Sequence, residues 1–306
     1  MSRVLISLPA DTALAGRMAP ALQARLAPLA IHRFPDGESR VTLADDDLRD
    51  ADVAIVASLR DPDPLALPLR FAAATAREFG ARSVGLVAPY LAYMRQDKRF
   101  NPGEAVSAPL FARFIEETFD WLVTADPHLH RFASLGELYR IPATEVSASH
   151  AVARWISASV PDAMLIGPDS ESEQWVARIA AEAGFPYQVL RKERHGDYDV
   201  RVSLPDATAA AGRTPVLVDD IVSSGHTILE TLTHLRRLAL KRPVLVAIHP
   251  VFAGDAYERL LEAGADRIVS TDTIPHATNA IGLAAELAEA ASDLIGTYLE
   301  VRREQR

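Results

Sequence analysis

The chain has 306 residues, 49% of them hydrophobic, and a chain of this length more often forms two domains than one. No stretch approaches 18 consecutive apolar residues, and no basic stretch leads into an apolar segment at the amino terminus. We therefore expect a soluble cytoplasmic protein with no membrane partner. The absence of cysteine excludes disulfides, thiolate nucleophiles and cysteine zinc sites. The net charge of -9 argues against a nucleic-acid partner, because binding to a phosphate backbone needs a basic surface.

Short β-branched runs alternate with helix-like segments along the chain, which is typical of an α/β protein with mostly parallel sheets. The expected strands are residues 4–8, 53–59, 84–88, 121–125, 164–167, 216–219, 244–248 and 268–270. Helical spacing is clearest for one apolar face, formed by Ile228, Leu229, Leu232, Leu235 and Leu238. A second such face is expected from Val106, Leu110, Phe111, Phe114 and Ile115.

The two halves of the chain contain a degenerate repeat. VAIVASL and VGLVAPY, within residues 53–90, match VLVDDIV and VLVAIHPVF, within residues 216–252. DWLVTAD at 120–126 likewise matches DRIVSTD at 266–272. The gaps between matching segments differ, so whole α/β domains are repeated and not the units of a short-period solenoid. Only the second half has an acid pair followed by SSGHT, which predicts that the domains share a fold and divide the chemistry.

The segment VLVDDIVSSGHT at 216–227 passes from an apolar strand through two acids into a small polar loop and a helix. At such a strand end, the N–H groups and hydroxyls of residues 223–227 can surround a phosphate, helped by the helix dipole. Asp219 and Asp220 would repel that phosphate, but they can accept hydrogen bonds from sugar hydroxyls or approach magnesium. A phosphorylated sugar satisfies both parts. The alternative is an N-capped helix with Asp219 and Asp220 as solvated loop acids.

This segment resembles the phosphoribosyl-pyrophosphate (PRPP) binding motif of phosphoribosyltransferases and of ribose-phosphate pyrophosphokinases, also called PRPP synthetases. Further motifs follow in the synthetase order: FPDGE at 34–38, RQDKR at 95–99, DPHLH at 126–130, GPD at 167–169 and RKER at 191–194. Together they make the chain similar to the ribose-phosphate pyrophosphokinase family, with the carboxyl-terminal half closest to its shorter, archaeal-like class.

The resemblance implies two tandem phosphoribosyltransferase-type domains, each a mostly parallel sheet flanked by helices, at 1–145 and 146–285. A carboxyl-terminal helix at 286–306 would pack back on the first domain. The implied reaction transfers the β,γ-diphosphoryl group of ATP to the 1-hydroxyl of ribose 5-phosphate, giving PRPP and AMP. Such a transfer needs charge neutralisation above all, so Mg²⁺ and basic side chains should dominate the site.

The resemblance implies that two motifs, FPDGE and RQDKR, bind ATP. The residues concerned are Phe34, Asp36, Gly37, Glu38, Arg95, Gln96 and Asp97. In the family the FPDGE loop reaches the ATP of a neighbouring subunit, so the protein would be at least a homodimer with shared ATP sites. Arg95 can fork onto phosphate oxygens, and Asp97 would orient the loop. Taken alone, FPDGE is a Pro-Asp-Gly turn and RQDKR is a solvated basic face.

By the same resemblance, the remaining motifs would bind ribose 5-phosphate, take part in catalysis and contact the metal. The ribose 5-phosphate residues are Arg194, Asp219, Asp220, Ser223, Ser224, Gly225, His226 and Thr227. Lys192 and Arg194 match the family's catalytic lysine and arginine, on a segment expected to be a mobile, exposed loop that acts as a lid. His128 and Asp169 match its metal-associated positions. One imidazole and one carboxylate cannot enclose Mg²⁺, so the ATP phosphates should complete its coordination.

Two features depart from the family pattern. His226 stands where glycine is common, which is tolerable if its backbone angle is ordinary and its imidazole points outward; otherwise it could donate to the 5-phosphate. Glu171 and Glu173 add negative charge after GPD, either toward solvent or to tune metal binding.

Two other functions stay open. A phosphoribosyltransferase is disfavoured by the length of the chain and by the FPDGE and RQD motifs. A catalytically silent, synthetase-like regulatory subunit that senses PRPP is disfavoured because Lys192, Arg194, His128 and Asp169 are all present.

Overall fold

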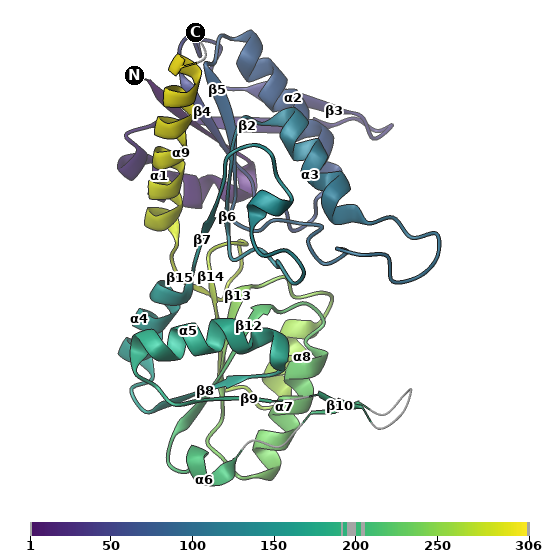
Figure 1. The fold of residues 1–306 in the computed structure, drawn as a ribbon, viewed down its shortest axis with the longest axis vertical. Helices are drawn as coiled ribbons and strands as arrows, with labels where there is room; N and C mark the ends of the chain where they lie inside the picture. Colours follow the sequence, from purple (N-terminus) through teal and green to yellow (C-terminus); the bar gives the residue numbers. More distant parts are fainter. Residues whose placement is uncertain (1, 191, 195–199, 203–205, 305–306) are drawn as a thin grey trace. The chain divides into compact units, whose positions relative to one another are not determined.

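The computed structural model of the chain divides into two compact units. Unit 1 comprises residues 1–146 and 284–306, and unit 2 comprises residues 147–283 (Figure 1). The structure describes residues 2–190, 192–194, 200–202 and 206–304, and for Lys192 and Arg194 it gives the backbone only. Among these residues no helix has the length and apolar character needed to cross a membrane.

Unit 1 is built on one mixed sheet. Its described strands are β1 (Arg3–Ser7), β2 (Arg25–Arg33), β3 (Ser39–Leu43), β4 (Asp52–Val56), β5 (Ser83–Ala88), β6 (Leu122–Ala125) and β7 (Ala143–Val146). Its helices are α1 (Thr12–Leu22), α2 (Asp63–Glu78), α3 (Ser107–Thr118) and α9 (Ala284–Glu304), with short 3-10 turns η1 (Pro9–Asp11) and η2 (Leu135–Glu137). The strand order is β3-β2-β1-β4-β5-β6-β7. The strands pair in parallel except β2 and β3, which form an antiparallel hairpin.

The central strands of unit 1 explain its layers. β4, β5 and β6 are buried along their whole lengths, and a sheet buried in this way needs helices on both faces. Figure 1 shows α1 and α9 side by side on one face and α2 and α3 on the other. One expected contact is wrong: Leu110 is 55% exposed. The face of α3 that packs on the sheet is Ala108, Ala112 and Ile115, and at 100° per residue Leu110 points away from it.

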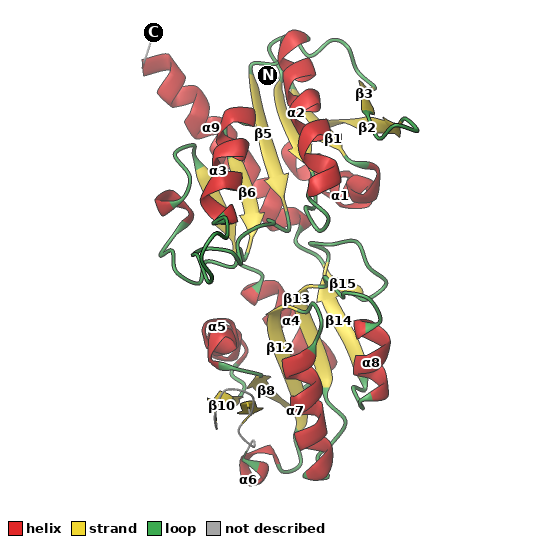
Figure 2. Ribbon diagram, turned by 90° about the vertical axis from the view of Figure 1, so that its right-hand side faces the viewer, coloured by secondary structure: helices red, strands yellow, loops and turns green. Residues whose placement is uncertain are grey.

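Unit 2 has a fully parallel sheet in its described part. Its elements are α4 (Ser149–Ser159), β8 (Ala163–Gly167), η3 (Ser170–Ser172), α5 (Glu173–Ala183), β9 (Tyr187–Val189), β10 (Lys192–Arg194), β11 (Val200–Val202), α6 (Ala207–Ala210), β12 (Thr214–Ile221), α7 (His226–Arg237), β13 (Val244–His249), α8 (Ala256–Glu262), β14 (Arg267–Thr271) and β15 (Asn279–Ile281). The strand order is β15-β14-β13-β12-β8-β9, and β10 and β11 pair separately as an antiparallel hairpin. Figure 2 shows α7 and α8 beside strands β12 to β14.

The core of unit 2 follows the helical spacing read from the sequence. Ile228, Leu232 and Leu235 of α7 are almost completely buried against β12 and β13. Strands β12, β13 and β14 are neighbours in this sheet, as β4, β5 and β6 are in unit 1. These are the strands that the internal repeat pairs, so the topology confirms a duplicated α/β fold.

Each of the expected strands is present, with bounds that differ by at most three residues. The expected end of the strand at residue 219 is wrong, because β12 continues to Ile221 and contains both acids of the VLVDD run. The strand expectations also missed β2 and β3, β7, β9 to β11 and β15. β2 contains Pro28, and a proline within an apolar run argues against a strand.

Asp11 is a buried acid beside the carboxyl ends of β1 and β4. It is 2% exposed, and its Oδ2 accepts a hydrogen bond of 3.1 Å from the Ser58 N–H. Its Oδ1 is buried without a hydrogen-bond partner in the described part of the chain. Burial outweighs the Ser58 hydrogen bond and raises the pKa of Asp11 to about 6. No charged side chain contributes to this shift, so desolvation of the ionised form is its main cause.

This shift makes the stability of the fold depend on pH. Because the folded-state pKa of Asp11 lies above its unfolded value of 3.8, the folded protein holds the proton more tightly and loses stability as the pH rises from 4 to 6. Asp11→Asn removes this titration. Between pH 4 and pH 7.5, the unfolding free energy of the variant should therefore rise by about 2 kcal/mol relative to that of the wild type. Urea denaturation at both pH values measures it, and a pH-independent difference would contradict the assignment.

Candidate functional site

The carboxyl end of β12 brings the two acids of the motif into the sheet edge. Asp219 is partly buried and Asp220 is 7% exposed. Asp219 Oδ1 accepts from the Asp220 N–H at 3.2 Å, and Asp220 Oδ1 accepts from the Ile221 N–H at 2.8 Å. The two carboxylates are thus held at the strand end by their own backbone, in the place where open parallel sheets bind ligands.

A tight loop carries the chain from β12 into α7. Gly225 is the N-cap of the helix, with φ +69°, and it provides no side-chain cap for the first turn. The first N–H groups of α7 are therefore left for a ligand or for water, together with the favourable end of the helix dipole. His226 is the first residue of α7, with an ordinary backbone angle and an exposed side chain. These are the conditions under which a side chain replaces the common glycine without strain.

The phosphate-sized loop is anchored from the neighbouring strand. The Val222 N–H donates to the His249 carbonyl at 3.1 Å, the Phe252 N–H to the Val222 carbonyl at 2.8 Å, and the Ala253 N–H to the Ser223 carbonyl at 3.1 Å. Below the loop, a Cβ on Gly225 would lie 3.2 to 3.4 Å from side-chain atoms of Leu260. The segment after β13 and helix α8 therefore fix the path of the loop.

The GPD motif ends β8 and starts a short 3-10 turn. Asp169 Oδ1 accepts from the Glu171 and Ser172 N–H groups at 3.1 and 3.3 Å, which forms a capping box. This cap gives Asp169 a structural role in addition to its expected metal role. Glu171 and Glu173 are both exposed, which fits the interpretation that their charge faces solvent.

The FPDGE residues form the turn of the β2–β3 hairpin, which projects from the rest of unit 1 (Figures 1 and 2). The Phe34 N–H donates to the Glu38 carbonyl at 2.9 Å, and Asp36 Oδ1 accepts from the Glu38 N–H at 3.2 Å. Gly37 has φ +92°, as the Pro-Asp-Gly pattern predicts. Phe34 is 39% exposed, and its ring meets that of His32 edge-on at 4.9 Å between centroids. The aromatic side chain is therefore presented at the surface.

The RQDKR residues begin a loop after β5 that is organised by an acid the motif does not contain. Glu104 accepts hydrogen bonds from Gln96 Nε2 at 3.2 Å, from the Phe100 N–H at 3.1 Å, and from the N–H and Nδ2 of Asn101 at 2.9 and 2.6 Å. These bonds, above all those from Asn101, lower the pKa of Glu104. Arg95 is exposed, whereas the carboxylate of Asp97 is only 2% exposed.

The DPHLH residues follow β6, the neighbour of β5 in the sheet. His128 is partly buried, and its ring stacks on that of His130 at 6.0 Å between centroids. Arg131, which the sequence analysis did not select, bonds to the Asp97 carboxylate and to His130. The structure thus brings the RQDKR and DPHLH motifs together in unit 1.

The candidate metal residues do not form a complete cage. In the described part of the chain, no group of three or more His, Asp or Glu side chains has the geometry to hold a metal. His128 belongs to unit 1 and Asp169 to unit 2, so their sharing of one ion stays a proposal. The available donors, a carboxylate and an imidazole, fit a magnesium ion that takes most of its oxygen ligands from substrate and water.

Lys192 and Arg194 of the RKER motif lie on β10 and not in the loop expected for them. Lys192 pairs with Val202 and Arg194 with Val200 across the hairpin. Residues 191 and 195–199, which belong to the expected lid, fall outside the described residues.

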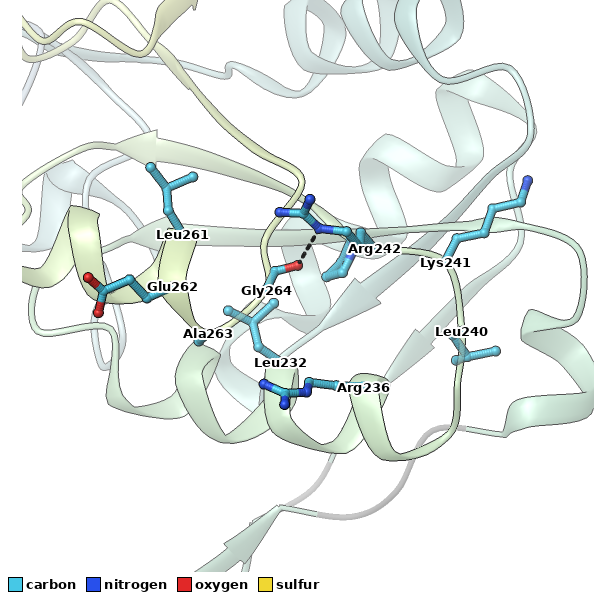
Figure 3. Close-up of a pocket in the computed structure, with 10 residues that line it drawn as sticks. Leu232, Arg236, Leu240, Lys241, Arg242, Leu261, Glu262, Ala263 and Gly264 are labelled. Atoms are coloured by element: carbon cyan, nitrogen blue, oxygen red, sulfur yellow. Dashed lines mark hydrogen bonds between the residues drawn. The ribbon is translucent and has the colours of Figure 1, made fainter.

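A cavity of about 360 Å³ lies in unit 2, near the carboxyl-terminal ends of α7 and α8 (Figure 3). Its walls include Leu232, Arg236 and Glu262, and Arg242 donates from Nε to the Gly264 carbonyl at 3.4 Å and from Nη2 to the Ala265 carbonyl at 2.8 Å. Arg242 immediately precedes β13, so the cavity is at the edge of the sheet opposite to Asp219 and Asp220. It is therefore separate from the candidate site.

Comparison with known proteins agrees with this architecture. The model of the N-terminal domain of ribose phosphate pyrophosphokinase matches residues 3–118, and the phosphoribosyl transferase domain model matches residues 134–286. The fold resembles the crystal structure of phosphoribosylpyrophosphate synthetase from Mycobacterium smegmatis, with a TM-score of 0.83 over 97% of this chain and 100% of that one, at 23% identity. The chain is thus a protein with two domains of phosphoribosyltransferase type.

Curated relatives identify the family within this class of proteins. A ribose-phosphate pyrophosphokinase of Methanopyrus kandleri is 33% identical over 96% of this chain and its whole length. One from Halobacterium salinarum is 34% identical over 94% of this chain and its whole length, and one from Methanosarcina acetivorans is 32% identical over 95% of this chain and 99% of its own. The chain belongs to the ribose-phosphate pyrophosphokinase family, and these archaeal relatives agree with its resemblance to the archaeal-like class.

The role of the loop before α7 in the candidate site can be tested by adding a side chain at Gly225. Gly225→Ala adds a Cβ against Leu260 and imposes a left-handed backbone on alanine, so we expect a loss of about 1–3 kcal/mol in unfolding free energy and weaker binding of ribose 5-phosphate. Thermal unfolding and calorimetric titration measure the two effects.

Gly254→Ala is the matched control, because Gly254 has φ +59° and open space around its Cβ position. It should show the backbone cost alone and leave ribose 5-phosphate binding close to wild type. Equal effects of the two substitutions on binding would contradict a role for the Gly225 loop in the site.

Proposed function

We propose that the protein is a ribose-phosphate diphosphokinase. The 1-hydroxyl oxygen of ribose 5-phosphate attacks the β-phosphorus of ATP, the bond from the β-phosphorus to the oxygen that bridges it to the α-phosphate breaks, and the hydroxyl proton is released. The products are PRPP and AMP. Membership of the family supports this reaction, and the observation that carries it is the acid pair of β12 followed by the uncapped first turn of α7.

The β12–α7 turn would bind ribose 5-phosphate in two parts. The first N–H groups of α7 and the hydroxyls of Ser223, Ser224 and Thr227 would donate hydrogen bonds to the 5-phosphate. Asp219 and Asp220, at the end of β12 just before the turn, would accept hydrogen bonds from the ribose hydroxyls. Their placement in the strand supports this division, because it keeps the carboxylates away from the N–H groups that meet the phosphate.

ATP would be bound by side chains from unit 1. Arg95 forks onto phosphate oxygens, and Gln96, oriented by Glu104, contacts the nucleotide. Phe34, Asp36 and Glu38 would serve the adenosine of a neighbouring subunit, and the exposed position of the hairpin supports a role outside its own subunit.

Lys192 and Arg194 would neutralise the diphosphoryl group during transfer, when charge spreads over its oxygens and onto the leaving AMP. Arg194 would also hold the ribose 5-phosphate. Bound Mg²⁺ would neutralise phosphate charge, with His128 and Asp169 as its protein contacts. The uncapped first turn of α7, the RQDKR loop and the family motifs all support this reaction.

The catalytic role of Lys192 predicts a loss in rate and not in binding. Lys192→Ala should lower turnover by about 100-fold or more, because a cation that acts in the transition state contributes several kcal/mol. Lys241→Ala is the control, since Lys241 pairs with Asp162 and lies just before β13, at the opposite sheet edge. AMP and PRPP are followed with ATP, Mg²⁺ and ribose 5-phosphate, and turnover of Lys192→Ala within tenfold of wild type rejects the role.

The same assay separates the two alternatives. A PRPP-sensing regulatory subunit would bind PRPP or nucleotide without producing AMP. A phosphoribosyltransferase would consume PRPP together with a base and leave ATP untouched. Production of PRPP and AMP in equal amounts distinguishes the proposed enzyme from both.

Sharing of the ATP site between subunits can be tested by mixing two inactive chains. One chain carries Phe34→Ala and Glu38→Ala, which leave the turn-forming bond of Asp36 in place; the other carries Lys192→Ala. In mixed dimers, one site combines the intact loop of one chain with the intact Lys192 of the other. Co-expression should therefore restore about a quarter of wild-type activity.

If each chain used its own loop, every site would carry a defect and the mixture would stay inactive. Separately purified variants that are never allowed to exchange subunits provide the control. No recovery on co-expression, with mixed dimers demonstrated by differently tagged chains, would reject the shared site.

A further inference from the structure

Arg131 occupies the junction of two loops that leave adjacent strands of unit 1. The RQDKR loop follows β5, and the DPHLH segment follows β6, to which β5 is paired. Arg131 comes directly after the second motif. Its side chain is 37% exposed, so it reaches from the surface toward the buried carboxylate of the first.

One nitrogen of Arg131 joins both loops. Nη1 lies 3.0 and 2.9 Å from the two carboxylate oxygens of Asp97 and 2.9 Å from Nδ1 of His130. Nη1 carries two hydrogens, so one can be shared by the carboxylate and the other given to the imidazole. Because the guanidinium can only donate, His130 must accept at Nδ1 and carry its proton on Nε2.

The pairing with Asp97 has an electrostatic reason. The Asp97 carboxylate is 2% exposed, and a buried carboxylate without a partner is strongly destabilising. It also lies beside Arg95 and Gln96, the residues proposed to meet the phosphates of ATP. Without Arg131, the carboxylate of Asp97 would be an uncompensated anion within the proposed nucleotide loop and would repel the phosphates of the ligand.

Ring contacts extend the junction on both sides. The Arg131 guanidinium lies 5.9 Å from the centroid of Phe100, and Lys98 Nζ lies 5.1 Å from the same ring. On the other side the His130 ring stacks on His128 with an interplanar angle of 7°. Arg131 thus contacts both a residue of the nucleotide loop and the neighbour of the candidate metal histidine.

We propose that Arg131 is a positioning residue for nucleotide binding, which holds Asp97 and His130 together and so sets the RQDKR loop against the DPHLH segment. This inference rests on the proposed function, because the two loops are its candidate nucleotide and metal groups. Arg131 acts through Asp97 and does not itself contact the nucleotide.

Steady-state kinetics test this role. Arg131→Ala should raise the KM for ATP about tenfold or more, because it leaves a buried anion beside the phosphates, while the KM for ribose 5-phosphate stays within about twofold. Arg131→Lys should recover part of the ATP affinity, since an ammonium can pair with Asp97 but lacks the planar guanidinium that serves two partners. Arg113→Ala, on the exposed side of α3, is the matched control and should leave both KM values unchanged.

A second arm separates positioning from direct contact. In an Asp97→Asn background no buried charge remains, so the added Arg131→Ala should change the KM for ATP much less than it does in the wild-type background. Equal effects in the two backgrounds would indicate that Arg131 touches the nucleotide directly, and would overturn positioning through Asp97.

The outcomes distinguish this inference from the function on which it rests. A wild-type protein that makes no PRPP and AMP overturns the proposed function and the inference with it. An active wild type whose KM for ATP is unchanged in Arg131→Ala overturns the inference alone. Equal increases in both KM values, with a lowered melting temperature, would show a merely structural role and would also overturn it.

Discussion

Parallel pairing of fully buried strands is the constraint from which the candidate sites follow. Buried parallel strands need helices on both faces, and every connection between them must cross from the carboxyl edge of the sheet to the amino edge. In both units the chain therefore turns from a strand into the next segment at the same edge. The β12–α7 turn, the GPD turn after β8, the RQDKR loop after β5 and the DPHLH segment after β6 all start there. Within each unit, polar groups that are distant in sequence are brought to one edge of its sheet by backbone pairing alone.

At the β12–α7 turn, the backbone also separates groups that would otherwise repel one another. The two acids are held in the strand, where each carboxylate accepts the N–H of the next residue. The uncapped N–H groups begin only after Gly225, so negative side chains and an anionic ligand can occupy different ends of the same short segment. A sugar phosphate carries its hydroxyls and its charge at different ends as well, which fits the proposed binding of ribose 5-phosphate at this turn.

The sequence allowed the central strands and α7 to be predicted because their apolar residues repeat with the period of a strand or a helix. It did not predict β2 and β3, because Pro28 interrupts β2 and β3 is short and mostly polar. It misjudged Leu110 because the small residues Ala108 and Ala112 form the buried face of α3. The motifs located the candidate site residues, but not the side chains that hold them. Glu104 and Arg131 act through loop geometry, and a loop has no period from which such contacts can be inferred. The acidic Glu104 and the basic Arg131 each resemble an ordinary surface residue until the fold is known.

The duplicated fold also allows the proposed anion-binding turn of unit 2 to be compared with the corresponding turn of unit 1. The turn of unit 1 that corresponds to β12–α7 leads from β4 into α2, whose first turn contains Asp63 and Pro64. Asp63 places negative charge at the end of the helix dipole that would attract an anion, and proline has no N–H to donate. The Ser58 N–H after β4 is already bonded to the buried carboxylate of Asp11. Unit 1 thus supplies its own negative charge where unit 2 leaves room for that of a ligand. This difference is consistent with the proposed division, in which the loops after β5 and β6 of unit 1 bind the nucleotide and unit 2 binds ribose 5-phosphate.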